Sequence, residues 1–383
     1  MLERNRVATR LPSAPPILPG LTYIRPLGSG GFADVFLYEQ DMPRRDVAVK
    51  VLPSDVRDPE LRRMFNAEAD VLAHLSAHPS IVTVYQAGIS ADGRPYIVME
   101  FCPGGLAHRY RRERVPVPEV LEIGVRMASA LESAHRAGLV HRDVKPSNIL
   151  VTTFGAPVLA DFGISSSLSR ATADEVLAMS IPWSAPEVVA EQTAGTVASE
   201  VWSLGATVYS LLAGHSPFER RERGQNTKEQ LRRRIARASY TPIARADVPA
   251  SLQDVLARAM SRDPSRRFAS AREFAEALRT VQAELGISPT LLEVPVDEWS
   301  AASASVDFAD SAMRGAARSQ VAHDERRKTR PDAGVSALAR DEDTDISMPD
   351  SARRRMLPWI IAGTAVLTAL IAVGAAIVAA GVL

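Results

Sequence analysis

The sequence predicts an α+β protein from three observations. Residues 21–101 contain short apolar runs with the alternation of β-strands and one helical stretch. From residue 118 to residue 285 the apolar periodicity is that of helices. The two kinds of element are segregated along the chain, strands first and helices afterwards, which is typical of the α+β class.

Bulk composition limits the partners and the compartment. The chain has 383 residues with 45 basic and 45 acidic side chains, so no excess charge favours nucleic acid as a partner. Its one cysteine, Cys102, excludes an internal disulfide and fits a reducing compartment. Residues 1–20 lack the apolar stretch of a signal peptide, and we expect them to form a flexible leader.

A glycine-rich run, LGSGGFADVF at residues 27–36, is predicted to join the first two strands. Glycines let the backbone approach phosphate oxygens, although such a run alone is more often a hairpin turn. In the next strand, residues 47–51, alternation places Ala48 and Lys50 on one face. A lysine beside a small residue suits a bound nucleotide; an edge-strand lysine in water is the alternative.

The helix predicted to begin at Asp58 and Pro59 carries a carboxylate, Glu68, within its apolar stripe. A buried carboxylate is costly unless it is paired. Lys50 is the natural partner, so we expect an ion pair between Lys50 and Glu68. A solvated boundary residue is the alternative for Glu68 taken alone.

The other expected elements follow in chain order. Strands are expected at residues 81–85 and 95–101, and the glycines after Cys102 are expected to break the pattern. The expected helices cover residues 118–136, 197–213, 251–260 and 270–285. An amphipathic helix within the arginine-rich residues 220–237 is more often a solvated face than a docking surface for an acidic partner.

The run HRDVKPSNIL, residues 141–150, brings three reactive side chains into one short loop. Asp143 can accept a proton from a hydroxyl nucleophile, and Lys145 can neutralise charge on a phosphoryl group. Asn148 can offer its amide oxygen to a hard cation such as Mg²⁺. Asp161 ends an apolar strand and is placed to chelate a metal ion. An ordinary polar turn is the alternative at both places.

In order and spacing these motifs resemble those of the eukaryotic-like serine/threonine protein kinases. The resemblance covers roughly residues 21–285. It implies a two-lobed protein-kinase fold, with a β-rich N-lobe at residues 21–101 and a helical C-lobe at residues 102–285. It also implies transfer of the γ-phosphate of ATP to protein serine and threonine hydroxyls, with Mg²⁺ or Mn²⁺ as the metal.

The resemblance gives roles to individual residues. The expected catalytic residues are Asp143 as the base, Lys145 at the γ-phosphate, and Lys50 with Glu68 at the α- and β-phosphates. The expected metal ligands are Asn148 and Asp161. The expected nucleotide-binding residues are Leu27, Gly28, Ser29, Gly30, Gly31, Val35, Ala48, Lys50, Met99, Glu100, Cys102 and Leu150.

Three positions depart from the family pattern. Ala33 stands where the third loop glycine is usual. Ser180 replaces a threonine, and we expect it to contact Asp143 and Lys145 in the threonine's place. Glu200 replaces an aspartate that supports the catalytic loop, and its extra methylene is expected to weaken that support.

Residues 164–179 are expected to form a mobile activation segment. Trans-autophosphorylation within a homodimer is expected at one or more of Ser165, Ser166, Ser167, Ser169 and Thr172. A phosphate there would pair with Arg142. Residues 185–187, at the end of the segment, are expected to form a structural ion pair with Arg267.

The C-terminal part is predicted to anchor the chain in the cell membrane. Residues 286–356 are expected to be a disordered juxtamembrane linker. Residues 357–381 are uncharged, long enough to span a bilayer, and preceded by three arginines at 353–355. We expect a single span with the kinase domain in the cytoplasm; a buried hairpin helix is the alternative.

Rival functions remain. A membrane-tethered pseudokinase or binding scaffold usually lacks Lys50, Asp143 or Asp161, all of which are present. A small-molecule phosphotransferase is disfavoured by the complete segment from residue 161 to residue 187. Phosphorylation of Thr344, within the acidic run DEDTD, would recruit a forkhead-associated domain, an adaptor role that can coexist with catalysis.

Overall fold

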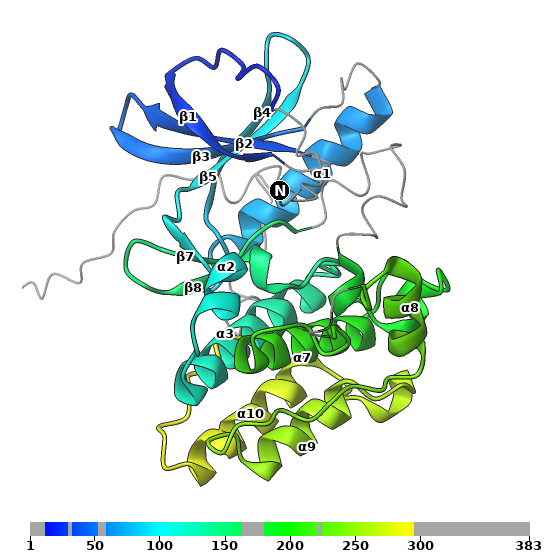
Figure 1. Cartoon of the computed structure of the whole chain (residues 1–383). Coiled ribbons are helices and arrows are strands. Elements are labelled where there is room, and N and C mark those ends of the chain that lie inside the picture. The colour runs from blue at the N-terminus through cyan, green and yellow to red at the C-terminus, as the bar shows by residue number, and fades with distance from the viewer. Residues whose placement is uncertain are drawn as a thin grey trace, which may run out of the picture. The chain divides into compact units, whose positions relative to one another are not determined.

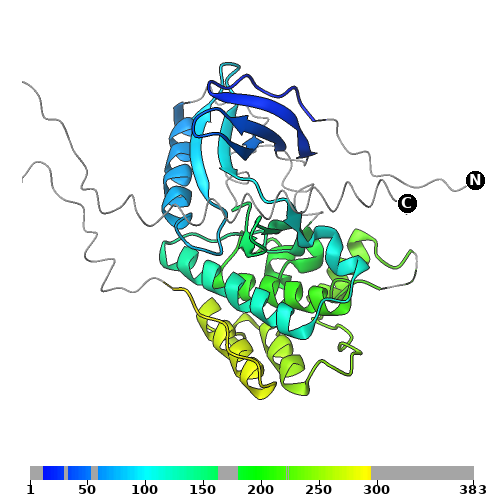
Figure 2. The ribbon, with the colours of Figure 1, turned by 90° about the vertical axis from the view of Figure 1, so that its left-hand side faces the viewer.

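The computed structural model describes residues 12–29, 33–52, 59–162, 180–220, 222 and 224–294. All of them belong to the first of two units into which the chain divides, residues 1–306. Figure 1 shows a lobe built mainly of strands above a lobe built mainly of helices, and Figure 2 shows the same ribbon from the side. The predicted α+β class and the predicted division into a strand-rich and a helical lobe are confirmed.

The N-lobe contains a five-stranded antiparallel sheet in the order β1-β2-β3-β5-β4. Its elements are β1 (Leu21–Ser29), β2 (Asp34–Gln40), β3 (Arg45–Val51), α1 (Pro59–Leu75), β4 (Val84–Ile89) and β5 (Pro95–Glu100). The predicted alternation in β3 is confirmed. Val47, Val49 and Val51 join one apolar cluster, whereas Ala48 joins another on the opposite face.

The strand predicted at residues 81–85 is wrong at its start. β4 begins at Val84, and the backbone before it pairs with the other lobe. Ile81 forms an isolated parallel bridge with Leu159, and the Val82 amide donates to the Leu159 carbonyl at 3.0 Å. An apolar run satisfies its backbone where a partner is available, and here that partner belongs to the C-lobe.

The C-lobe holds most of the apolar core. Its helices are α2 (Leu106–Arg112), α3 (Val117–Arg136), α6 (Pro186–Val189), α7 (Val197–Ala213), α8 (Lys228–Ala236), α9 (Ala250–Ala259) and α10 (Ala271–Glu284), with short 3₁₀ turns η1 (Pro146–Asn148), η2 (Ile181–Trp183) and η3 (Pro264–Arg266). α7 has the predicted bounds because Thr196 caps its start in a capping box and Gly214, at φ 78°, ends it. α7 packs against α3 and α9.

A small three-stranded sheet lies next to the connection between the lobes. It consists of β6 (Gly104–Gly105), β7 (Ile149–Val151) and β8 (Pro157–Leu159). The two glycines were expected only to break the strand pattern. Instead they pair through their backbone with Val151 and Leu150, and that pairing fixes the chain beside the catalytic loop.

Residues 12–20, predicted as part of the flexible leader, pack on the N-lobe. Leu18 is buried in the sheet cluster, and the Tyr38 hydroxyl donates to the Pro16 carbonyl at 2.6 Å. The Ser13 hydroxyl donates to Asp34 at 2.6 Å, and Arg94 donates to the Ser13 hydroxyl at 2.9 Å. The leader is therefore hydrogen-bonded to Asp34, the first residue of β2.

Residues 286–294, predicted as the start of the linker, also pack on the molecule. His78 Nε2 donates to the Glu293 carbonyl at 2.7 Å, and the Glu293 amide donates to the Ser129 hydroxyl at 3.3 Å. Gln282 and Thr290 exchange two hydrogen bonds. The packed domain therefore extends beyond α10.

No helix among the described residues is long and apolar enough to cross a membrane. The predicted span at residues 357–381 and the rest of the linker lie outside those residues.

Candidate active site

An apolar cluster joins the two lobes beside the connection between them. It combines side chains from β1, β2, β3 and β5 with others from β7 and the end of β8. Its buried members are Ala48, Val82, Met99, Val158 and Ala160, with Leu27, Val35, Cys102 and Leu150 packed against them. Six expected nucleotide-binding residues thus meet in one cluster, which offers apolar walls to a flat ring: Leu27, Val35, Ala48, Met99, Cys102 and Leu150.

The other expected nucleotide contacts lie around this cluster. Gly28 and Ser29 end β1, and Glu100 ends β5, where its amide donates to the Thr83 carbonyl at 2.9 Å. Burial raises the pKa of the Cys102 thiol to about 12, so this thiol stays protonated at neutral pH. Gly30 and Gly31 lie outside the described residues.

Lys50 reaches across the lobes to Asp161. Its Nζ lies 2.9 Å from Asp161 Oδ1, and the lysine is 7% exposed. The charge of Lys50 is the largest influence on Asp161, whose pKa it lowers. The expected partner Glu68 belongs to α1, but its side chain is outside the described residues, so the predicted Lys50–Glu68 pair stays a prediction.

The backbone of Asp161 is strained. Its φ of 64° lies in the left-handed region, which costs a residue with a Cβ about 1–2 kcal/mol. The residue before it, Ala160, is fixed by two bonds. Its amide donates to the Asn148 carbonyl at 2.9 Å, and its carbonyl accepts from His141 Nε2 at 3.0 Å. These bonds place Asp161 beside the catalytic loop.

Within that loop, Asn148 is oriented by Asp143. Asn148 Nδ2 donates to the Asp143 carbonyl at 2.7 Å and to Asp143 Oδ2 at 3.0 Å. Because the amide nitrogen is committed, the amide oxygen is the atom left for a cation; its contact with the Ser147 hydroxyl is long, 3.4 Å. The buried Asn148 is thereby held in one orientation.

The donor set suits a hard cation completed by phosphate. Asn148 and Asp161 offer amide and carboxylate oxygens, the ligand types that Mg²⁺ prefers, and such ions usually keep only one or two protein ligands beside phosphate oxygens. Among the described residues, no group of three or more His, Cys, Asp or Glu side chains is arranged to hold a metal. The two residues fit a metal shared with a nucleotide.

Ser180 contacts Asp143 and Lys145, as predicted. Its hydroxyl donates to Asp143 Oδ1 at 2.5 Å and accepts from Lys145 Nζ at 3.0 Å. Lys145 Nζ also lies 2.8 Å from Asp143 Oδ2. The serine therefore supplies the hydroxyl that the family's threonine would supply, and it orients both charged groups.

Glu200 supports the catalytic loop from α7. Its Oε1 accepts from the Arg142 amide at 2.5 Å, and Arg142 has a strained φ of 69°. Its Oε2 lies 2.7 Å from His135 Nε2 of α3. The glutamate thus bonds the catalytic loop as the family's aspartate would, and its second oxygen also contacts His135. His135 was not identified from the sequence as a partner of Glu200. The glutamate in place of the family's aspartate at position 200 was the one feature of the sequence that could have suggested a second partner.

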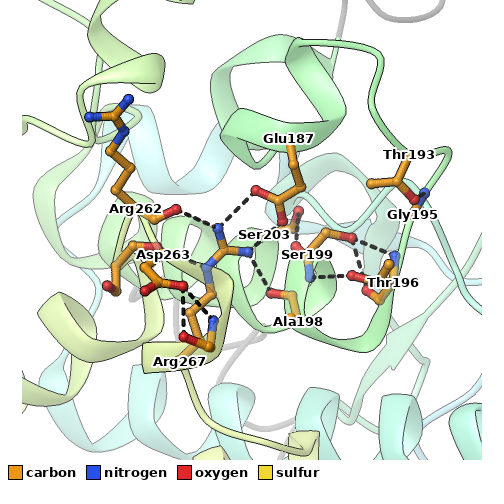
Figure 3. A network of polar contacts seen from close by, with 12 residues as sticks. Glu187, Thr193, Gly195, Thr196, Ala198, Ser199, Ser203, Arg262, Asp263 and Arg267 are labelled. Carbon is orange, nitrogen blue, oxygen red and sulfur yellow. Dashed lines mark hydrogen bonds and ion pairs between the residues drawn. The ribbon is translucent and has the colours of Figure 1, made fainter.

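Figure 3 shows the predicted ion pair between Glu187 and Arg267. The two guanidinium terminal nitrogens lie 2.6 and 2.9 Å from the two carboxylate oxygens. Arg267 also donates to the carbonyls of Ser261 and Ala198, both at 2.9 Å. The prediction is confirmed, and the pair fixes the end of the activation segment to the chain near η3. The hydroxyls proposed for autophosphorylation lie outside the described residues: Ser165, Ser166, Ser167, Ser169 and Thr172.

Comparison with known proteins gives a consistent result. The family model described as protein kinase domain matches residues 21–279. The serine/threonine-protein kinase PknK of Mycobacterium tuberculosis is 41% identical over 281 residues, which cover 73% of this chain and 25% of PknK. PknF, from the same species, is 37% identical over 276 residues, 68% of this chain and 56% of PknF.

The chain is also similar to solved structures, of which the following is an example. The PknI kinase domain of Mycobacterium tuberculosis, crystallised as a mutant with one cysteine replaced by alanine, is 32% identical with a TM-score of 0.53. The match covers 71% of this chain and 100% of that one. The matched region spans about a quarter of PknK and just over half of PknF.

Proposed function

The chain belongs to the protein kinase family, and on that premise we propose that it is an ATP-dependent serine/threonine protein kinase. The observation that supports this most is the convergence of Lys50, Asp143 and Asp161 where the lobes meet. Lys50 forms an ion pair with Asp161. Asn148 donates from its side chain to Asp143, and its carbonyl accepts from the amide of Ala160, the residue before Asp161. Lys50 and both aspartates are the groups that a pseudokinase usually lacks.

Each group has a role that its surroundings suit. Asp143 would orient the serine or threonine hydroxyl of a protein substrate and accept its proton. Lys145 and Lys50 would hold phosphate oxygens and neutralise their charge. Asn148 and Asp161 would hold a divalent cation, for which we propose Mg²⁺ or Mn²⁺; a metal bound with ATP supplies charge neutralisation between the phosphates.

The direct test is incorporation of labelled γ-phosphate from ATP into a protein substrate in the presence of Mg²⁺ or Mn²⁺. We expect transfer by the unchanged chain and a loss of about 10²–10⁴-fold in Asp143→Asn. Asp254→Asn, an exposed aspartate on α9, is the matched control and should transfer normally. Stabilisation of the chain by ATP without any transfer would contradict the proposal and favour a binding scaffold.

The regulation and location that we propose are supported by the sequence. We propose trans-autophosphorylation in the activation segment, and a single membrane span at residues 357–381 with the kinase domain in the cytoplasm, in membrane-linked signalling. Phosphopeptide mapping of the unchanged chain and of Asp143→Asn tests the first. Fractionation of cells that express the chain with and without residues 357–383 tests the second; equal recovery in the soluble fraction would contradict it.

A forkhead-associated domain that binds phosphorylated Thr344 is a further proposed partner. A pull-down in which Thr344→Ala behaves like the unchanged chain would remove it.

A further inference from the structure

An arginine-rich helix borders the stretch of chain next to the catalytic carboxylate. α8, labelled in Figure 1, packs against η2 and α6, the two short elements that follow Ser180 in the chain. Ser180 is itself bonded to Asp143. A protein substrate that presents its hydroxyl to Asp143 would therefore extend past η2 and within reach of α8.

The charge of this region differs from that of the whole chain. Residues 220–237 contain eight lysines and arginines and two glutamates, whereas the full chain is balanced at 45 of each sign. We name Arg220, Arg232 and Arg234 the arginine surface. Burial lowers the pKa of Arg234, and the nearby positive charge of Arg220 lowers it further, because the two cations repel each other.

The described contacts of the arginine surface leave it short of negative charge. Arg220 Nη1 donates to an amide oxygen, Oε1 of Gln225, at 3.1 Å. Arg234 Nη2 likewise donates to Oδ1 of Asn226 at 3.0 Å. The partners of these two guanidinium groups are thus neutral amides. Carboxylates would bind the same groups more strongly.

Arg232 Nη2 forms an ion pair with the carboxylate of Glu191 at 3.6 Å, a distance too long for a hydrogen bond, and the side chain of Glu191 is 69% exposed. Within the described part of the chain, Nε and Nη2 of Arg232 and Nε of Arg234 are buried without a hydrogen-bond partner. A buried donor without an acceptor has lost its bonds to water and not replaced them.

We propose that the arginine surface is a docking site for acidic segments of protein substrates, so that it selects substrates beyond the transfer site. The inference rests on the proposed kinase function. Carboxylates near the accepting hydroxyl would balance the excess positive charge of residues 220–237, and guanidinium groups bind carboxylates through paired hydrogen bonds. This chain contains such a segment, Thr344 within DEDTD at residues 341–345, which makes it a suitable probe.

The test uses the full chain as the enzyme and two peptides as substrates. One peptide has the sequence of residues 338–346, in which Thr344 is the hydroxyl residue. In the other, the four acidic residues of DEDTD are replaced by asparagine and glutamine. We expect the KM of the neutral peptide to be about tenfold that of the acidic one, since two charge-assisted contacts are lost.

The variant Arg232→Gln with Arg234→Gln should bring the ratio of the two KM values toward one. Arg233→Gln is the matched control, because Arg233 is on the same helix, its side chain is 73% exposed and it pairs with Glu229. Its ratio should stay near that of the unchanged chain. If the double variant does not fold, the ratio in the unchanged chain must fall as salt is raised.

Equal KM values for the two peptides with the unchanged chain, or a ratio that survives in the double variant or in high salt, would overturn the docking site and leave the kinase function intact. Failure to phosphorylate both peptides and any other protein would instead overturn the kinase function, and the docking site with it.

Discussion

Two charged pairs of similar length, Lys50 with Asp161 and Arg267 with Glu187, differ in how completely they are satisfied. Arg267 has a fully buried side chain and donates to both oxygens of Glu187 and to several carbonyls. The ammonium of Lys50 has three donors, and the contact described for it is Asp161, whose side chain is 43% exposed. The Arg267–Glu187 pair therefore serves only to stabilise the fold. The Lys50–Asp161 pair leaves hydrogen-bond donors of Lys50 and part of the Asp161 carboxylate available to a ligand.

The comparison predicts that the two pairs fail in different ways. Removal of Lys50 should lower activity strongly and leave stability nearly unchanged, whereas removal of Arg267 should act first through a loss of stability.

The largest effect on activity is expected for Lys50→Met. The charge that holds phosphate oxygens is lost, which should lower kcat/KM by about 10²–10³-fold. The thermal midpoint should change little, because Asp161 is partly exposed and can be solvated. Phosphate transfer and melting measured on the same preparation check both halves; normal transfer by Lys50→Met would break the comparison.

The largest effect on stability is expected for Arg267→Met. Loss of one member of a buried pair leaves Glu187 uncompensated and should lower the free energy of unfolding by about 3–5 kcal/mol. Denaturant unfolding measures this. Arg44→Met, which breaks an exposed pair with Glu39, is the control and should leave the midpoint nearly unchanged. Equal losses in the two variants would show that burial does not matter here.

A smaller effect is expected for Ser180→Ala. Its hydroxyl bonds to two charged groups, and such bonds contribute about 1.5–3 kcal/mol, so kcat should fall by about 10–100-fold. Ser180→Thr should retain activity because the hydroxyl remains. Ser203→Ala removes a hydroxyl that donates to the Ser199 carbonyl within α7 and serves as the control. An active Ser180→Ala enzyme would mean that Asp143 and Lys145 are positioned without it.

The smallest effect concerns acid stability. Lys50 lowers the pKa of Asp161, so the ionised carboxylate contributes stability above the ordinary carboxyl pKa, and this is lost as pH falls through the lowered value. Lys50→Met should raise the pKa of Asp161 and remove that part of the acid dependence. Denaturant unfolding of both chains between about pH 2 and 6 measures it. Superimposable pH dependences would contradict the coupling.

Much of the fold follows from periodicity and capping. The apolar helix α7 and the two faces of β3 were predictable because burial selects side chains at fixed spacing. The contacts of Ser180 and the Arg267–Glu187 pair followed from motif positions.

Other features leave no periodic signal. Gly104 and Gly105 pair through backbone alone, and Ile81 has the composition of a strand but a partner in the other lobe. The segments before β1 and after α10 are irregular, so their packing depends on single contacts such as Ser13 with Asp34. The pair between Lys50 and Asp161 joins the two lobes. It could not be predicted from the sequence because the distance between these side chains is set by the folded backbone of both lobes.

The bond from His78 to the Glu293 carbonyl sets a practical limit on recombinant fragments. A fragment that stops at Leu285, where helical periodicity ends, would strip His78 of its acceptor and uncover the Ser129 hydroxyl between α3 and the missing tail. A start after Pro19 would likewise detach Arg94 and Asp34 from Ser13. Expression boundaries should therefore enclose residues 12–294, a longer piece than residues 21–279, which match the protein kinase domain model.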